Sequence, residues 1–248
     1  MNHYNMLGKI HSFQSLGTLD GPGIRYVVFL QGCNLRCSCC HNPDTWDLNG
    51  GTLYSVSDII SKVVRYKEYF NDIGGLTVSG GEPLLQSEFV KELFIKAKEE
   101  GINTCLDTSG SVLNEDIVEL LKHTDYVLLD IKYTTNEKYL KYVGCSFDKV
   151  ISFLEVLEKL NVNTIIRQVI VPSINDNVED TMKLIDVVNK YSVVSKIELL
   201  PFKKICISKY QKLGIKFPFE NIDEPNAYKM NELNDIINSR FNNNDTLR

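Results

Sequence analysis

Three cysteines are spaced closely enough to bind one iron–sulfur cluster. Cys33, Cys37 and Cys40 follow a C-x3-C-x2-C spacing. A [4Fe–4S] cluster contains four irons and is usually held by four cysteine thiolates. Three neighbouring ligands without an evident fourth would leave one iron open. An open iron can bind a substrate, whereas a fully ligated electron-transfer cluster cannot.

Core packing and zinc binding are the two alternatives to an iron–sulfur cluster. Free cysteine packs as a small hydrophobic residue, but four of the seven cysteines lie within residues 33–40, and packing residues do not cluster in this way. A Cys3His zinc site that includes His41 is the stronger alternative. Zinc loops usually combine one C-x2-C pair with a second pair, and this sequence has no such second pair. We therefore prefer the iron–sulfur interpretation.

Cys39 is the only nearby candidate for a fourth thiolate. Side chains of adjacent residues on an extended or turning loop point in different directions. Cys39 and Cys40 should therefore not both face the cluster, and we predict that Cys39 is not a ligand. If it were, the cluster would be fully ligated and the protein would be an electron-transfer module without radical chemistry.

The elements that would position these residues alternate between short apolar strands and amphipathic helices. Strands are predicted at residues 25–30, 76–79, 103–107, 126–131, 164–171 and 196–200, and helices at 56–70, 87–100, 115–122, 148–160, 178–191 and 227–241. Several strands are apolar on both faces, as buried parallel strands are. Asn114 and Asn177 stand where helix N-caps belong, and Gly101 stands where a left-handed residue ends a helix. Six β-α units in series predict a parallel sheet, as an open sheet or a partial barrel.

Polar and ionisable residues follow these strands at their carboxyl ends. The three cysteines follow the first strand, Gly80, Gly81 and Glu82 the second, Asp107 and Thr108 end the third, Asp130 and Lys132 end the fourth, Arg167 lies in the fifth, and Lys203 follows the sixth. Ligands of open α/β sheets and barrels gather at the carboxyl ends of the strands. We therefore expect one site at this edge, although the two aspartates could equally be strand-end caps and the two glycines turn residues.

Composition limits the class of protein. The 248 residues suit one α/β domain over residues 1–248, with a frayed tail at 242–248. A net charge of −5 argues against a general nucleic-acid binder. No apolar run approaches the ~18 residues of a membrane span, and the N-terminus lacks the layout of a signal peptide. A clustered, odd number of cysteines then predicts a reducing, cytoplasmic location.

The cysteine loop and a second motif together resemble the radical S-adenosylmethionine (radical SAM) superfamily. The second motif is Gly80-Gly81-Glu82-Pro83, which follows the cysteines along the chain. The resemblance implies a partial (β/α)6 barrel of parallel strands. It also implies a [4Fe–4S] cluster whose open iron chelates the amino and carboxylate groups of S-adenosylmethionine. A glycine-rich strand end suits this ligand, because without a Cβ the backbone can approach it closely.

Further segments resemble the activases of glycyl-radical enzymes, and among them the pyruvate formate-lyase-activating family. These segments are residues 8–13, 20–25, 40–47, 104–108, 129–132 and 196–201, and the similarity runs from about residue 8 to residue 240. Many other activases carry a cysteine-rich, ferredoxin-like insert after the first cluster, and this chain has none. The activase of anaerobic ribonucleotide reductase is much shorter. Both features favour pyruvate formate-lyase as the partner, with another glycyl-radical enzyme as the alternative.

The resemblance also assigns roles by position. Cys33, Cys37 and Cys40 would ligate the cluster, while Gly80, Gly81, Glu82, Asp107, Asp130, Lys132 and Arg167 would bind S-adenosylmethionine. Cys39 would line this site where the family has an aromatic residue, and Lys203 where the family has a histidine. Asp107, Thr108, the carbonyl of Leu128 and Asp130 would hold Na⁺ or K⁺, because two aspartates beside a ligand carboxylate would otherwise repel each other. The segment 20–23 is a candidate contact for the incoming glycine, or a plain turn.

The implied reaction has a protein as its substrate. Reductive cleavage of S-adenosylmethionine at the cluster would be followed by removal of hydrogen from a glycine α-carbon of pyruvate formate-lyase, an enzyme of anaerobic glucose metabolism. Flavodoxin or ferredoxin would supply the electron, and the activase would act as a monomer. The glycine must come within roughly 3–3.5 Å of the reacting carbon. An open barrel therefore suits this substrate better than a sealed one.

Overall fold

Eight strands form one sheet in the order β3-β1-β2-β4-β5-β6-β7-β8. The computed structural model describes residues 6–241. The strands are β1 (Leu7–Gly17), β2 (Arg25–Leu30), β3 (Thr52–Ser55), β4 (Gly75–Gly80), β5 (Asn103–Thr108), β6 (Tyr126–Asp130), β7 (Asn163–Ile170) and β8 (Val194–Pro201). The sheet is open, because β3 and β8 lie at opposite ends of this order and do not pair with each other.

The six strands predicted from the sequence are the parallel part of this sheet. Strands β2, β4, β5, β6, β7 and β8 pair in parallel with their neighbours, and each predicted strand matches an observed one to within two residues at either end. Their central residues are almost completely buried, as the apolar runs predict. The predicted partial (β/α)6 barrel is therefore confirmed as an open, mostly parallel sheet.

Two strands extend the sheet beyond the predicted barrel. β1 pairs antiparallel with both β2 and β3. The sequence analysis did not predict either strand, because neither presents a continuous apolar run. Most of β1 is exposed or half-buried, with Ile10 and Gly17 among its few buried positions, and β3 has no buried residue. Pairing with β2 therefore stabilises β1 where local composition does not.

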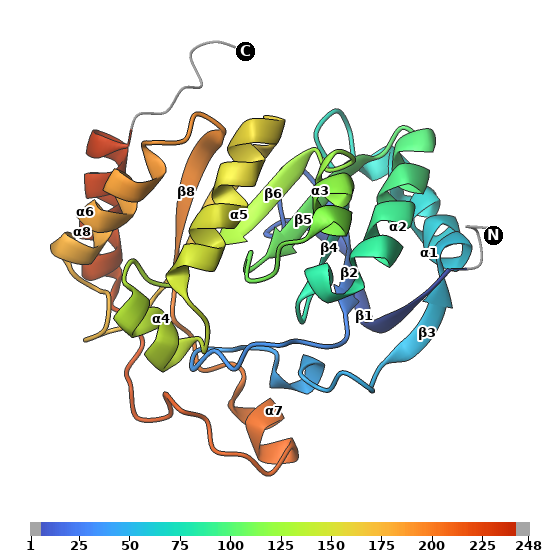
Figure 1. Cartoon of the computed structure of the whole chain (residues 1–248). Helices are drawn as coiled ribbons and strands as arrows, with labels where there is room; N and C mark the ends of the chain where they lie inside the picture. The colour runs from blue at the N-terminus through green and yellow to red at the C-terminus, as the bar shows by residue number, and fades with distance from the viewer. Residues whose placement is uncertain (1–5, 242–248) are drawn as a thin grey trace.

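Helices surround the sheet, and most of them cover its outer face (Figure 1). They are α1 (Val56–Val63), α2 (Ser87–Glu99), α3 (Glu115–Leu121), α4 (Asn136–Tyr142), α5 (Phe147–Leu160), α6 (Val178–Val188), α7 (Ile207–Lys212) and α8 (Ala227–Arg240). The expected caps are confirmed: Asn114 accepts a hydrogen bond from Ile117 N and Asn177 from Asp180 N, and Gly101 has a φ of +68°. The helix predicted at residues 56–70 ends earlier, because the chain continues from Val64 to Tyr69 as a 3-10 helix.

Two short helices, α4 and α7, are absent from the sequence prediction. Both lie at the carboxyl end of the parallel strands, beside the long blue loop that follows β2 (Figure 1). No helix within residues 6–241 is long and apolar enough to cross a membrane. The tail at 242–248, which the sequence predicts to be frayed, lies outside the described residues.

A small apolar layer lies inside the barrel at mid-height. Cys105, Leu128 and Ile165 form a small buried cluster, with Tyr126 packed against it. These residues come from the adjacent strands β5, β6 and β7. A polar cavity lies at the carboxyl ends of the strands, and Tyr126 and Ile165 also line a second cavity toward their amino ends.

Candidate active site

A cavity of about 230 Å³ lies at the carboxyl ends of the parallel strands. It brings together most of the residues that the sequence analysis proposed. Its lining includes Cys33, Cys37, Cys39, Cys40, Gly80, Gly81, Glu82, Asp107, Thr108, Asp130, Lys132 and Arg167. Residues that follow different strands therefore line one cavity, as the rule that ligands gather at this edge of a parallel sheet predicts.

The cysteine loop is held by the two helices that the sequence analysis missed. At the end of α4, the carbonyl of Tyr142 accepts a hydrogen bond from Ser38 N at 2.8 Å. From α7, the hydroxyl of Tyr210 donates to the carbonyl of Cys40 at 3.2 Å. Lys209 Nζ donates to Asn42 Oδ1 at 2.8 Å. The loop is thus bound on both sides by segments far away in the sequence.

Burial disfavours ionisation of the cysteine thiols in this loop, whereas binding to iron would favour it. Burial raises the pKa of Cys33 to about 11, and it also raises the pKa values of Cys37 and Cys40. The protein alone would therefore keep these thiols protonated, and a bound metal would displace the protons. Backbone N–H groups point at two of the sulfurs, from Leu35 to Cys33 Sγ at 3.4 Å and from Asn42 to Cys40 Sγ at 3.3 Å. Such N–H···S contacts are typical of iron–sulfur sites.

A zinc site and an iron–sulfur cluster make different demands on the cysteine loop. Within residues 6–241, no three His, Cys, Asp or Glu side chains converge closely enough to hold one metal ion. A tetrahedral zinc site needs such convergence, whereas a cube distributes its thiolates over separate irons. Cys39 is buried in an apolar cluster with Phe202, Cys206 and Tyr210. Cys37 is likewise buried among apolar residues, so packing does not distinguish the cysteines, and the non-ligating role of Cys39 stays a prediction.

The two glycines of the second motif are needed by the protein itself. Gly80 has a φ of +111°, and a Cβ on it would lie 2.4 Å from Leu30 N. A Cβ on Gly81 would lie 2.1 Å from the carbonyl oxygen of Gly32, directly before the cysteines. From the sequence alone, these glycines are explained by close approach of a ligand. The structure adds a collision with the backbone of β2 and its following loop.

Glu82 connects two loops of the site. Its Oε1 accepts hydrogen bonds from Leu84 N at 3.1 Å and from Thr108 Oγ1 at 2.6 Å, and its Oε2 accepts from the N–H and hydroxyl of Ser109. Burial raises the pKa of Glu82, and these donors oppose that rise. Because protein donors satisfy both oxygens, the carboxylate holds the loop after β4 against the loop after β5.

Four ionisable side chains stand on the floor of the cavity. Lys132 Nζ lies 2.7 Å from Asp130 Oδ2, and Arg167 NH1 lies 3.5 Å from Asp107 Oδ2. Ser79 Oγ donates to the same Asp107 oxygen at 2.7 Å. Burial, together with the charge of Asp130, raises the pKa of Asp107 to about 6 despite the opposing effect of Arg167. The two aspartates and two cations suit a zwitterionic ligand.

Two residues proposed from the sequence do not line this cavity with their side chains. Lys203 Nζ pairs with Glu224 Oε2 at 2.8 Å, while the backbone carbonyl of Lys203 contacts His41 Nε2 at 2.9 Å. The side chain of Leu128 belongs to the apolar layer below. Its carbonyl, in register with Asp107 on β5, stays a predicted cation ligand.

The loop at residues 20–23 is anchored by a buried arginine. Arg25 is 0% exposed, and its guanidinium donates to the carbonyls of Pro22, Ile73 and Leu76. Thr77 Oγ1 donates to the carbonyl of Asp20 at 2.7 Å. Two buried donors therefore hold the segment in place at the amino end of β2, and its contact with an incoming glycine stays a prediction.

Known proteins resemble this chain in sequence and in fold. Residues 27–185 match the family model of the Radical SAM superfamily. The chain is 41% identical over 239 residues to a pyruvate formate-lyase-activating enzyme of Staphylococcus epidermidis, covering 93% of this chain and 95% of that protein. It is 43% identical over 229 residues to one of Clostridium pasteurianum, covering 92% and 96%. Streptococcus suis SuiB, solved with its precursor peptide SuiA, shares the fold with a TM-score of 0.67 at 17% identity, over 86% of this chain and 45% of that chain.

Proposed function

The chain belongs to the radical SAM superfamily and, within it, to the family of pyruvate formate-lyase-activating enzymes, and from this premise we propose that it activates pyruvate formate-lyase. The reaction is reductive cleavage of S-adenosylmethionine and removal of a hydrogen atom from a glycine of the partner, which leaves a glycyl radical there. The observation that carries this proposal is the single cavity that joins three cysteines to the ionisable residues at the strand ends.

The residues of this chain supply binding and orientation. Cys33, Cys37 and Cys40 would hold a [4Fe–4S] cluster, which supplies the electron for cleavage and an open iron for the amino acid end of S-adenosylmethionine. Lys132 and Arg167 provide positive charge for the ligand's carboxylate, and Asp130 provides negative charge for its cationic groups. Glu82 acts by holding the surrounding loops in place, since protein donors satisfy its carboxylate.

A monovalent cation would complete this charge balance. Asp107 and Asp130 stand at the ends of neighbouring strands, and the raised pKa of Asp107 reflects burial and the charge of Asp130. Na⁺ or K⁺ between them, with Thr108 and the carbonyl of Leu128 as further ligands, would keep both carboxylates ionised beside the ligand's own. The register of β5 and β6 supports this, because it places Leu128 opposite Asp107.

The partner must present its glycine inside the open barrel. The segment at residues 20–23, which is hydrogen-bonded to Arg25 and Thr77, borders the amino-end cavity through Pro22 and is the contact we propose for the incoming glycine loop. We further propose that the protein acts as a monomer in the cytoplasm, with flavodoxin or ferredoxin as electron donor. The net charge of −5 supports neither nucleic acid nor an anionic membrane surface as partner.

The test is isotope transfer to the cleaved cosubstrate. Anaerobic, cluster-loaded protein is incubated with reductant, S-adenosylmethionine and pyruvate formate-lyase that carries deuterated glycine. We expect methionine, 5′-deoxyadenosine that contains deuterium, and an electron paramagnetic resonance doublet from a carbon radical with one α-hydrogen. Unlabelled partner is the control for the coupling pattern.

Two results would contradict the proposal at different levels. Failure of the cluster-loaded protein to cleave S-adenosylmethionine would refute the radical chemistry. Cleavage without deuterium transfer, together with activation of another glycyl-radical enzyme in a parallel incubation, would leave the chemistry intact and refute pyruvate formate-lyase as the partner.

A further inference from the structure

Arg167 stands between two acidic residues in one row across the sheet. The register of β6 and β7 pairs it with Asp130, and the register of β7 and β8 pairs it with Glu198. Residues paired in this way on one face of a sheet lie next to each other. Asp130 is already bound to Lys132 at 2.7 Å. Glu198, to which the sequence analysis assigned no role, is therefore the other acidic neighbour in the row.

The guanidinium of Arg167 is only partly satisfied by the site. Its NH1 reaches Asp107 Oδ2 at 3.5 Å, the outer limit of a hydrogen bond. Its Nε is buried without a hydrogen-bond partner and lies 3.9 Å from Glu198 Oε2. An arginine presents five N–H donors in a fixed plane. A carboxylate on the Nε side therefore determines how the opposite edge of the guanidinium faces the cavity.

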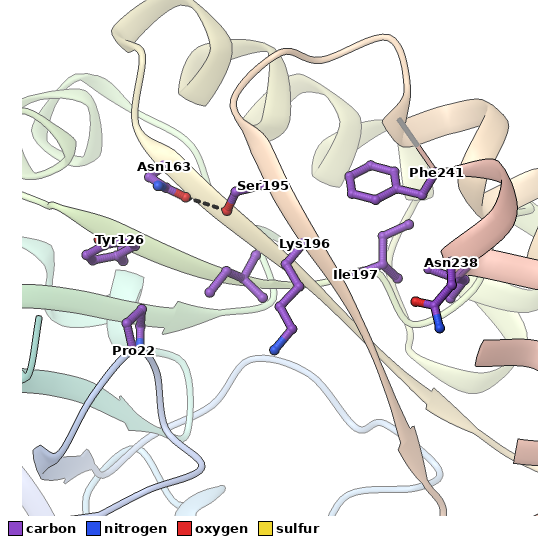
Figure 2. A pocket seen from close by; sticks show the side chains of 10 residues that line it. Pro22, Tyr126, Asn163, Ser195, Lys196, Ile197, Asn238 and Phe241 are labelled. Atoms are coloured by element: carbon purple, nitrogen blue, oxygen red, sulfur yellow. Dashed lines mark hydrogen bonds between the residues drawn. The ribbon is translucent and has the colours of Figure 1, made fainter. Parts of the chain in front are cut away.

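Glu198 is itself paired with a lysine of its own strand, β8. Lys196 Nζ lies 2.8 Å from Glu198 Oε1, so one carboxylate bridges two cations. Lys196 is 62% exposed and extends from β8 into the cavity of about 570 Å³ at the amino ends of the strands (Figure 2). The Lys196–Glu198–Arg167–Asp107 series thus runs from the lining of the amino-end cavity to the lining of the cavity at the carboxyl ends.

We propose that Glu198 is a positioning residue that sets the orientation of Arg167 toward S-adenosylmethionine, and that Lys196 limits how closely Glu198 approaches Arg167. This rests on the proposed function only for the identity of the ligand. The contact geometry stands without it. Loss of Glu198 frees the Nε edge to rotate, whereas loss of Lys196 releases Glu198 toward Arg167.

Nuclear magnetic resonance of the Arg167 guanidinium tests the proposal directly. The chain has six arginines, so ¹⁵N-arginine labelling gives few Nε–H resonances, and an Arg167→Lys sample identifies the one of interest. The protein is studied with its oxidised cluster in place. We expect Glu198→Gln to shift the Arg167 Nε–H resonance and speed its exchange with water. We expect Lys196→Met to shift the Arg167 Nε–H resonance in the opposite direction, toward that of a hydrogen-bonded Nε–H, and to slow its exchange with water.

Ligand affinity gives the second readout. Calorimetric titration of the cluster-loaded protein with S-adenosylmethionine should show about tenfold weaker binding for Glu198→Gln, within the range of coupling in one ion-pair network. Lys196→Met should bind at least as tightly as the unmodified protein. The matched control is Glu179→Gln, which removes a carboxylate that also pairs with a lysine, at 2.6 Å, but on the surface of α6. It should change neither readout.

The outcomes separate this inference from the proposed function. An unchanged Arg167 resonance in Glu198→Gln, or a changed one with unaltered affinity, would overturn the positioning role. So would a Glu198→Gln protein that only unfolds more easily. If the unmodified protein binds S-adenosylmethionine and the variants respond as expected, but no glycyl radical forms on the partner, the proposed function fails and the positioning role stands.

Discussion

Gly80→Ala tests whether the protein's own backbone requires this glycine. The new Cβ would meet Leu30 N at 2.4 Å and Leu30 O at 2.5 Å, in the neighbouring strand β2. Ordinary contacts of a Cβ begin near 3.4 Å, so β2 and β4 would have to separate by about 1 Å at their carboxyl ends. Leu30 O also accepts a hydrogen bond from Gly81 N at 2.9 Å, which this movement would weaken.

The expected loss of stability in Gly80→Ala has two parts, backbone strain and overpacking. A substitution at Gly144 measures the backbone strain alone. Gly144 has a φ of +90°, close to the +111° of Gly80, but no atom lies within 4 Å of the position that a Cβ would take there. Gly144→Ala should therefore cost only the backbone strain, about 1–2 kcal/mol. Gly80→Ala adds overpacking and a weakened hydrogen bond, so we expect it to cost about 2–4 kcal/mol more.

The assay is guanidinium unfolding of the cluster-loaded protein under anaerobic conditions. Coincident transitions by two probes first establish two-state behaviour. The free energy of unfolding is then compared between the two variants, provided that their m-values, the slopes against denaturant concentration, are equal. Iron content provides a second measurement. The end of β2 leads directly to Cys33, so Gly80→Ala should lower iron per chain and Gly144→Ala should not.

A small difference between the variants would refute the steric argument. If the two variants have the same free energy of unfolding, the backbone of β2 tolerates a methyl group at residue 80. If in addition only the affinity for S-adenosylmethionine falls, close approach of the ligand accounts for the glycine, as the sequence alone suggested.

Three further predictions concern other parts of the site. Arg25→Met should lower the free energy of unfolding by about 3–5 kcal/mol, because buried carbonyls lose their donor; the exposed Arg65→Met should change it by less than about 0.5 kcal/mol, and equal midpoints for both would contradict the anchoring role. Cys39→Ala should keep a four-iron cluster and S-adenosylmethionine cleavage, whereas Cys37→Ala should lose the intact cluster by iron analysis and electron paramagnetic resonance; the reverse pattern would make Cys39 the ligand. Asp130→Ala should weaken S-adenosylmethionine binding and remove any dependence on Na⁺ or K⁺ in calorimetric titrations, and a wild-type affinity that is identical in all salts would rule out the cation site.

The parallel strands could be predicted because their signal is local. A strand that is buried on both faces must be apolar along its whole length, and the run at residues 126–130 shows this without reference to any other segment. The candidate cluster ligands are local for the same reason, since three cysteines within one short loop need no fold to bring them together. Their place at a strand end then follows from the general rule for parallel sheets.

The supports of the cysteine loop could not be predicted in this way. Helices α4 and α7 are short and largely polar, so they show no clear amphipathic period. Their function depends on contacts such as that of Tyr210 with Cys40, which are 170 residues apart in the sequence. Only the folded chain shows that these helices hold the loop.

Glu82 and Glu198 show the same limit for individual side chains. The motif places Glu82 beside the ligand, but the structure directs its carboxylate to Thr108 and Ser109 on the next strand's loop. The sequence offers Glu198 only as a charge within an apolar strand, and the register of β7 and β8 makes it the neighbour of Arg167. Residue pattern along the chain therefore determined the parallel strands, the candidate cysteine ligands and their common edge. Strand register and long-range packing decided which side chains line the cavity and which hold its loops together, because those partners are set by the fold and not by neighbours in sequence.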